Sequence, residues 1–170
     1  MKLRDLMNEN NRQDLYHFCG IETLFKIIES DRLGALGLPV SLTRNKNFNQ
    51  QSQIFNETDV RFTINTNKLQ QRYKLIPYHW GADKFYNRNN DSSNSFEDQS
   101  EEQTTKPISG FKDFVKETTV KEINLWDYLD EDNWQYLTSV CRFFKKDPED
   151  ISYNDLETYL LKSEYKVKII

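Results

Sequence analysis

One short run of regular alternation constrains the fold more than any other part of the chain. The apolar residues Val60, Phe62 and Ile64 alternate with polar residues up to Asn65. Successive side chains of a strand point to opposite faces, so this pattern predicts a strand over residues 60–65. The chain must therefore build a β-sheet around this segment.

A helix and further strands are predicted on either side of it. Between residues 21 and 33 the apolar positions Ile21, Leu24, Phe25 and Ile28 recur at helical spacing, which predicts an amphipathic helix that ends near Gly34. Short apolar runs predict strands over residues 15–18, 40–43, 73–78, 136–144 and 165–170. A second helix is expected over residues 154–162, started by Ser152 or Asn154. With 170 residues, the chain is expected to form a single α+β domain over residues 1–170.

A polar segment interrupts this pattern. Residues 87–106 contain one large apolar residue, Phe96, among Asn, Ser, Gln and acidic residues. Such a composition is typical of a flexible insertion, because it cannot bury enough apolar surface to order itself.

Composition excludes several classes of protein. No stretch approaches the roughly 20 apolar residues that a membrane span needs, and the first residues lack the apolar run of a secretory signal, so a cytoplasmic protein without a membrane partner is expected. Cys19 and Cys141 lie far apart and the chain has only two His, so neither a disulfide scaffold nor a closed zinc site is expected, and no metal is predicted. The net charge of -4 argues against a purely electrostatic nucleic-acid binder. Residues 1–86 carry 12 basic and 9 acidic residues, whereas residues 87–170 carry 11 and 18.

Three local clusters are candidates for chemistry. Tyr16 and His17 end a predicted strand just before a helix, where a side chain can either meet a ligand or simply pack at the junction. Arg44, after Ser41 and Thr43, offers a planar fork of donors that suits phosphate, although a single Arg in a polar loop is usually solvated. The third cluster is the charged segment KETTVKE, residues 116–122, whose acidic side chains are surface residues in the simplest interpretation.

The order of these clusters resembles the mono-ADP-ribosyltransferases, above all the bacterial and phage relatives of the DNA-targeting ADP-ribosyltransferase toxins. The matching phrases are LYH at residues 15–17, SDRL at 30–33, VSLTR at 40–44 and KETTVKEINLWDYL at 116–129. The resemblance covers residues 14–45, 59–79 and 110–129, about half of the chain. It departs from the family at residues 116 and 118, where Lys and Thr stand in place of Glu and Arg.

The resemblance implies a mixed or antiparallel split β-sheet with flanking helices, and NAD as a substrate whose ADP-ribose passes to a protein, nucleic-acid or small-molecule acceptor. It places catalytic roles on Glu117 and Arg44, with Glu122 as a competing carboxylate. NAD-binding roles then fall on five residues in the first half of the chain, His17, Tyr16, Ser41, Thr43 and Tyr78.

A protein without catalysis is the alternative. In that interpretation the chain is a phage or mobile-element module that binds a host protein or a nucleotide. The aromatic and acidic segment around Trp126, Tyr128, Trp134 and Tyr136 would then be a protein interface, because aromatic side chains anchor interfaces. The simpler interpretation is that these aromatic residues are half-buried parts of the core between two strands.

Overall fold

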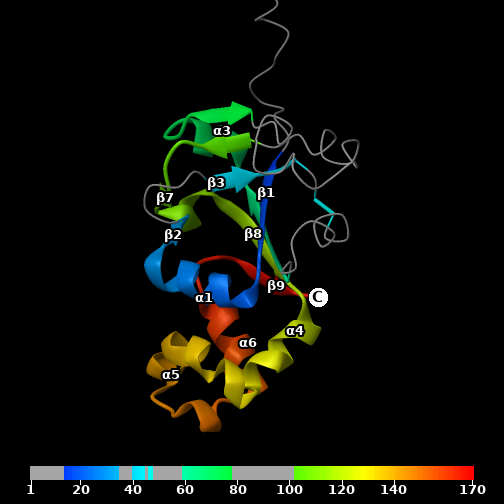
Figure 1. Cartoon of the computed structure of the whole chain (residues 1–170), viewed down its shortest axis with the longest axis vertical. Coiled ribbons are helices and arrows are strands. Elements are labelled where there is room, and N and C mark those ends of the chain that lie inside the picture. The colour runs from blue at the N-terminus through cyan, green and yellow to red at the C-terminus, as the bar shows by residue number, and fades with distance from the viewer. Residues whose placement is uncertain (1–13, 35–39, 45, 48–58, 78–101) are drawn as a thin grey trace, which may run out of the picture.

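The computed structural model describes residues 14–34, 40–44, 46–47, 59–77 and 102–170. This part of the chain is a mixture of helices and three β-sheets (Figure 1). In the first half the elements are β1 (Leu15–Cys19), α1 (Ile21–Ser30), β2 (Arg32–Leu33), β3 (Val40–Leu42), β4 (Val60–Ile64), α3 (Thr66–Gln70) and β5 (Leu75–Pro77). They are followed by β6 (Glu102–Thr104), β7 (Ile108–Ser109), the 3-10 helix η5 (Phe111–Phe114), β8 (Val115–Val120) and α4 (Glu122–Trp126). The remaining elements are η6 (Asp127–Leu129), η7 (Glu131–Leu137), α5 (Thr138–Phe144), η8 (Pro148–Asp150), α6 (Tyr153–Lys162) and β9 (Val167–Ile169).

The largest sheet has the strand order β1-β4-β8-β9. Its first three strands are antiparallel neighbours, and β9 joins parallel to β8, so the predicted C-terminal strand is confirmed. The alternation that predicted β4 is also confirmed, since Val60, Phe62 and Ile64 are fully buried. Phe62 lies at the centre of the core, with its ring centroid 5.1 Å from that of Phe111 and 6.0 Å from that of Tyr165.

Helices cover the buried face of this sheet and extend beyond it. Figure 1 shows α1 and α6 beside the long strands, with α4 and α5 at the end of the molecule opposite the three-stranded sheet. The helix predicted over residues 21–33 is present but stops at Ser30, because Asp31 turns left-handed with a φ of 48°. The Asp31 carboxylate accepts hydrogen bonds from the Lys112 backbone N–H at 2.9 Å and from the Tyr165 hydroxyl at 2.7 Å. These bonds hold the unusual backbone conformation and join α1 to η5 and to the chain after α6.

The three-stranded sheet has the order β3-β6-β5. It corrects the predicted flexible insertion: residues 87–101 lie outside the described part of the chain, but Glu102–Thr104 form the central strand of this sheet. Backbone pairing to strands on both sides orders these polar residues, which is a non-local effect that composition does not reveal.

A second correction concerns residues 136–144. They were predicted as a strand, but Thr138–Phe144 form helix α5 and the preceding residues belong to η7. The buried or half-buried Leu137, Val140, Cys141 and Phe144 are spaced at three and four residues, so they make one helical face against the core. The helix predicted over 154–162 is confirmed as α6, with Ser152 as its N-cap.

Candidate active site

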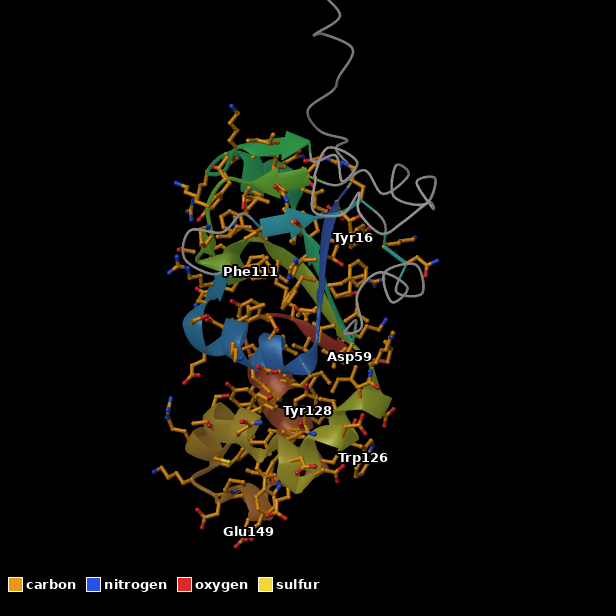
Figure 2. All side chains as sticks on the ribbon, in the orientation of Figure 1. Tyr16, Asp59, Phe111, Trp126, Tyr128 and Glu149 are labelled. Carbon is orange, nitrogen blue, oxygen red and sulfur yellow. The ribbon has the colours of Figure 1, made fainter. Side chains whose placement is uncertain are left out.

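The three-stranded sheet meets the largest sheet at one point, where β1 and β3 touch. The backbone N–H of Tyr16 donates to the Thr43 carbonyl at 2.7 Å, and the N–H of Thr43 donates back to the Tyr16 carbonyl at 2.9 Å. β3 crosses the end of β1 at this junction, and Tyr16 lies beside it (Figure 2). The two predicted clusters, LYH and VSLTR, are therefore brought together by the fold.

His17 is fixed at this junction by a hydrogen bond to β3. Its Nδ1 lies 3.1 Å from the carbonyl oxygen of Ser41, and its ring stacks against that of Phe62 with centroids 6.4 Å apart. A carbonyl can only accept, so Nδ1 carries the proton and the neutral ring presents Nε2 as an acceptor. Burial lowers the pKa of His17 below its usual 6.5, and the bond to Ser41 opposes that effect only in part. The ring is thus neutral at neutral pH.

Arg44 leaves the end of β3 and holds an acid that sequence reasoning missed. Its Nε donates to Oε1 of Glu102 at 2.8 Å, and its second guanidinium nitrogen contacts the same oxygen. Both side chains are mostly shielded, with exposed fractions of 23% and 18%. Two donors to one carboxylate oxygen fix the orientation of the carboxylate and direct Oε2 elsewhere.

The neighbouring residue of β6 lies on the face of the three-stranded sheet opposite to Glu102, because successive side chains of a strand alternate. Gln103 pairs with Ser41 across the sheet, and its Nε2 lies 3.0 Å from the Ser41 hydroxyl. Thr43 is buried at 4% exposure. We use the term "β1–β3–β6 junction" for the site formed by Tyr16, His17, Ser41, Thr43, Arg44, Glu102 and Gln103.

Glu117, the carboxylate singled out from the sequence, is not brought together with His17. In the largest sheet Tyr16 pairs with Thr63 and Thr63 pairs with Glu117, so these three share one face. His17 pairs with Phe62 and therefore shares the opposite face. Strand alternation alone thus separates the two predicted residues.

Glu117 instead belongs to a polar network on its own face of the sheet. The Thr119 hydroxyl donates to Glu117 at 3.2 Å, and Arg61 donates to the same Thr119 oxygen at 3.1 Å. The Arg61 guanidinium also lies over the Tyr16 ring, 5.8 Å from its centroid. This network links side chains of β1, β4 and β8 on that face.

The remaining predicted residues lie away from the junction or cannot be placed. Glu122 is exposed in the first turn of α4, and its backbone N–H donates to the Ile170 carbonyl. Tyr78 lies outside the described residues. In the described ranges no group of three or more His, Cys, Asp or Glu side chains is arranged to hold a metal ion.

A separate cavity of about 240 Å³ lies between the ends of α1 and α6. Its walls include Phe143 and Tyr159, and its charged groups already have partners: Lys112 contacts Glu164, Asp31 accepts from Tyr165, and Lys162 lies over the Phe143 ring, 5.9 Å from its centroid. This pairing leaves little polar recognition for a ligand, so the β1–β3–β6 junction is the stronger candidate site.

Comparison with known proteins adds no family: no family model matches the chain, and no curated protein and no solved structure is significantly similar to it. In the part of the chain that the structure describes, no helix is long and apolar enough to cross a membrane.

Proposed function

We propose that the chain is an NAD-dependent ADP-ribosyltransferase whose site is the β1–β3–β6 junction and whose carboxylate is Glu102. The observation that carries the proposal is the contact of Arg44 with Glu102. Glu102 lies on the strand beside β3, and the Ser41 carbonyl of β3 accepts the hydrogen bond from His17. The two sheets that meet at β1 and β3 are compatible with the split sheet that the resemblance implies.

Transfer of ADP-ribose breaks the bond between the nicotinamide nitrogen and C1 of the ribose. The bonding electron pair leaves with nicotinamide, and positive charge develops on the ribose before the acceptor forms its own bond to C1 and loses a proton. A fixed carboxylate beside the ribose stabilises that charge, and it can accept the proton. Glu102 suits this task because Arg44 holds one of its oxygens and leaves the other for the substrate.

The neighbouring residues then serve to bind NAD. His17 offers a neutral Nε2 that accepts a hydrogen bond from a ribose hydroxyl or from the nicotinamide amide group. Ser41 supplies a hydroxyl group, whereas Thr43 is buried and the Tyr16 ring lies on the face of β1 opposite to His17, so both stay predicted contacts from the resemblance. Tyr78 stays a predicted contact from the resemblance.

The acceptor is a protein, a nucleic acid or a small molecule, so the test uses a readout that needs none of them. In the absence of an acceptor water can take its place, giving ADP-ribose, nicotinamide and a proton. Full-length protein incubated with NAD labelled in the nicotinamide ring is expected to release labelled nicotinamide. Glu102→Gln should lower the rate by about 100-fold or more, the scale of one lost electrostatic contact to a transition state.

Glu117→Gln is the matched control, because it makes the same chemical change in the largest sheet, on the face opposite to His17. It should retain release within a few-fold of the unmodified protein. A loss of release in Glu117→Gln together with full release in Glu102→Gln would reverse the assignment. NAD binding by calorimetry without any nicotinamide release indicates a nucleotide-binding module, and the absence of NAD binding rejects the proposed function.

A further inference from the structure

The helical end of the molecule carries an aromatic surface that the proposed active site does not use. Of the four aromatic residues that the sequence marked as a candidate interface, Tyr128 and Trp134 pack against the core, and Tyr136 is half-buried. Trp126 differs, because 54% of it is exposed. Phe143, Leu161 and Ile170 are similarly exposed, but an indole offers a larger and flatter contact surface to a partner.

Trp126 is held rigidly on a second aromatic ring. Its indole stacks on Tyr153 with centroids 4.3 Å apart and an angle of 16° between the ring planes. The two rings come from different helices, α4 and α6, so the stack joins two elements. One indole face is covered by the tyrosine, and the exposure of the residue leaves the rest available to solvent in a fixed orientation. A partner would therefore lose little conformational entropy in ordering it.

Each helix adds a carboxylate to the stack. Glu122 lies four residues before Trp126 on α4, and Glu157 lies four residues after Tyr153 on α6, so each acid shares a helix face with its aromatic residue. Burial, followed by the charges of Glu122 and Glu157 and a hydrogen bond with Glu122, raises the pKa of Tyr153. We call Trp126, Tyr153, Glu122 and Glu157 the aromatic–acid platform.

The surroundings of the platform are acidic as well. Residues 122–136 contain five acidic residues and no Lys or Arg. Asp59, directly before β4, accepts a hydrogen bond from Asn124. Lys121 precedes α4, and its charge acts on the Asp59 carboxylate. The electrostatic field of this end therefore attracts positive charge and repels phosphate.

From this geometry we propose that the aromatic–acid platform docks an arginine side chain of a basic protein segment. A guanidinium is planar, so it stacks on the open face of Trp126 while its N–H groups donate to the carboxylates of Glu122 or Glu157. Arginine fits better than lysine because an ammonium group cannot make both contacts in one plane. This inference is independent of the proposed NAD site, which lies at the other end of the sheet.

The test is a titration of the full chain with a short acetylated Gly–Arg–Gly–Arg–Gly peptide. The indole N–H of Trp126 is one of three tryptophan indole signals in a proton–nitrogen NMR spectrum, and we expect it to shift saturably. The matched peptide carries citrulline in place of arginine, which keeps the shape but removes the charge. We expect it to bind at least about 5-fold more weakly, the scale of a surface cation–π contact combined with an ion pair.

Three variants locate the site. Trp126→Ala removes the indole signal itself, and it should also abolish any shift that the peptide causes in the other signals of the spectrum. Glu157→Gln should weaken peptide binding about 2-fold to 5-fold without disturbing the aromatic stack. Leu161→Ala is the matched control, because Leu161 is also 54% exposed but is not part of the platform. It should bind the arginine peptide as the unmodified protein does.

The proposal is overturned by any of four results. These are no shift of the Trp126 indole, equal binding of the arginine and citrulline peptides, undiminished binding by both Trp126→Ala and Glu157→Gln, or a Trp126 response to a single-stranded oligonucleotide and not to the peptide. Circular dichroism of each variant separates loss of the platform from loss of the fold.

Discussion

At the scale of single residues, the protonation of His17 is the most direct test of the junction. Burial lowers the pKa of its ring below 6.5, and the Ser41 carbonyl requires the proton on Nδ1. Nitrogen NMR of the imidazole is therefore expected to give a titration midpoint below 6.5 and the Nδ1–H tautomer in the neutral form. A midpoint above 6.5 contradicts the burial of the ring, and a neutral ring protonated on Nε2 contradicts the geometry of the β1–β3 contact.

The same residue makes the fold sensitive to acid. Because the folded pKa is the lower one, the unfolded chain binds a proton first as pH falls, and stability is lost as the pH drops below about 6.5. Urea unfolding at pH 7.5 and 5.5 should give a smaller free energy of unfolding at the lower pH. His17→Gln should flatten this difference, and an equally steep difference in the variant would assign it to other groups.

The two carboxylates illustrate what single residues in a sequence can and cannot predict. Tyr16, His17 and Arg44 stand out in the sequence because strand ends adjoining a helix or loop are places where side chains meet ligands. Glu102 does not stand out, because its strand exists only through pairing with β3 and β5, and the polar letters around it predict a loop. The face that Glu117 occupies depends on its register with Thr63, which no local pattern in KETTV records.

At the scale of elements, the start of α6 predicts how the stability of the fold depends on pH, both in direction and in pH range. Ser152 and Asp155 form a capping box, and Lys146 also binds the Asp155 carboxylate at 2.8 Å. The Lys146 bond, followed by the bonds from Ser152, lowers the pKa of Asp155 from its usual 3.8 to about 2. The carboxylate therefore stabilises the fold above about pH 4, and this contribution is lost as pH falls from 4 towards 2.

Asp155→Asn should accordingly lower the free energy of unfolding by about 1–2 kcal/mol at pH 7. The difference from the unmodified protein should shrink below pH 4, because the unmodified carboxyl is then neutralised too. Thermal unfolding at pH 7 and pH 3 measures both effects. The exposed Asp132→Asn is the control and should change the melting temperature little at either pH. If Asp155→Asn instead lowered the melting temperature by the same amount at pH 7 and pH 3, the charge of Asp155 would be excluded as the cause.

Two turns that need glycine allow a matched comparison. Gly34 and Gly110 both have positive φ, at 92° and 63°. A Cβ on Gly34 would approach Cγ2 of Val40 to 2.5 Å, whereas one on Gly110 would meet nothing nearer than Asp113 at 3.7 Å. Gly110→Ala should cost about 1 kcal/mol from backbone strain, and Gly34→Ala clearly more because strain and a steric clash add. Chemical denaturation measures the free energy of unfolding of both variants. Equal losses in the two variants would mean that Val40 moves aside freely.

The helices and strands were predicted correctly where the spacing of apolar residues decides the structure. The prediction failed where the residue types favour a strand but the spacing of apolar residues favours a helix. The alternation from Val60 to Ile64 and the helical spacing from Ile21 to Ile28 were sufficient. Residues 136–144 contain valine and paired phenylalanines, which favour a strand by propensity. Their spacing of three and four is helical, and packing against α6 decided in favour of the helix. The end of α1 at Ser30 depends on Asp31 contacts with Lys112 and Tyr165, which lie far away in sequence.

At the scale of the whole molecule, one core joins the sheet end to the helical end. Leu15 in β1 and Leu137 between η7 and α5 are both fully buried and belong to the same cluster. The single domain predicted from length should therefore unfold in one cooperative step.

Leu15→Ala and Leu137→Ala should each lower the free energy of unfolding by about 2–5 kcal/mol. Tryptophan fluorescence, which includes Trp126 and Trp134 at the helical end, should give the same loss as hydrogen exchange of the β4 amides. If the ends were independent domains, Leu137→Ala would leave β4 exchange unchanged, because a cavity destabilises only the cooperative unit that contains it.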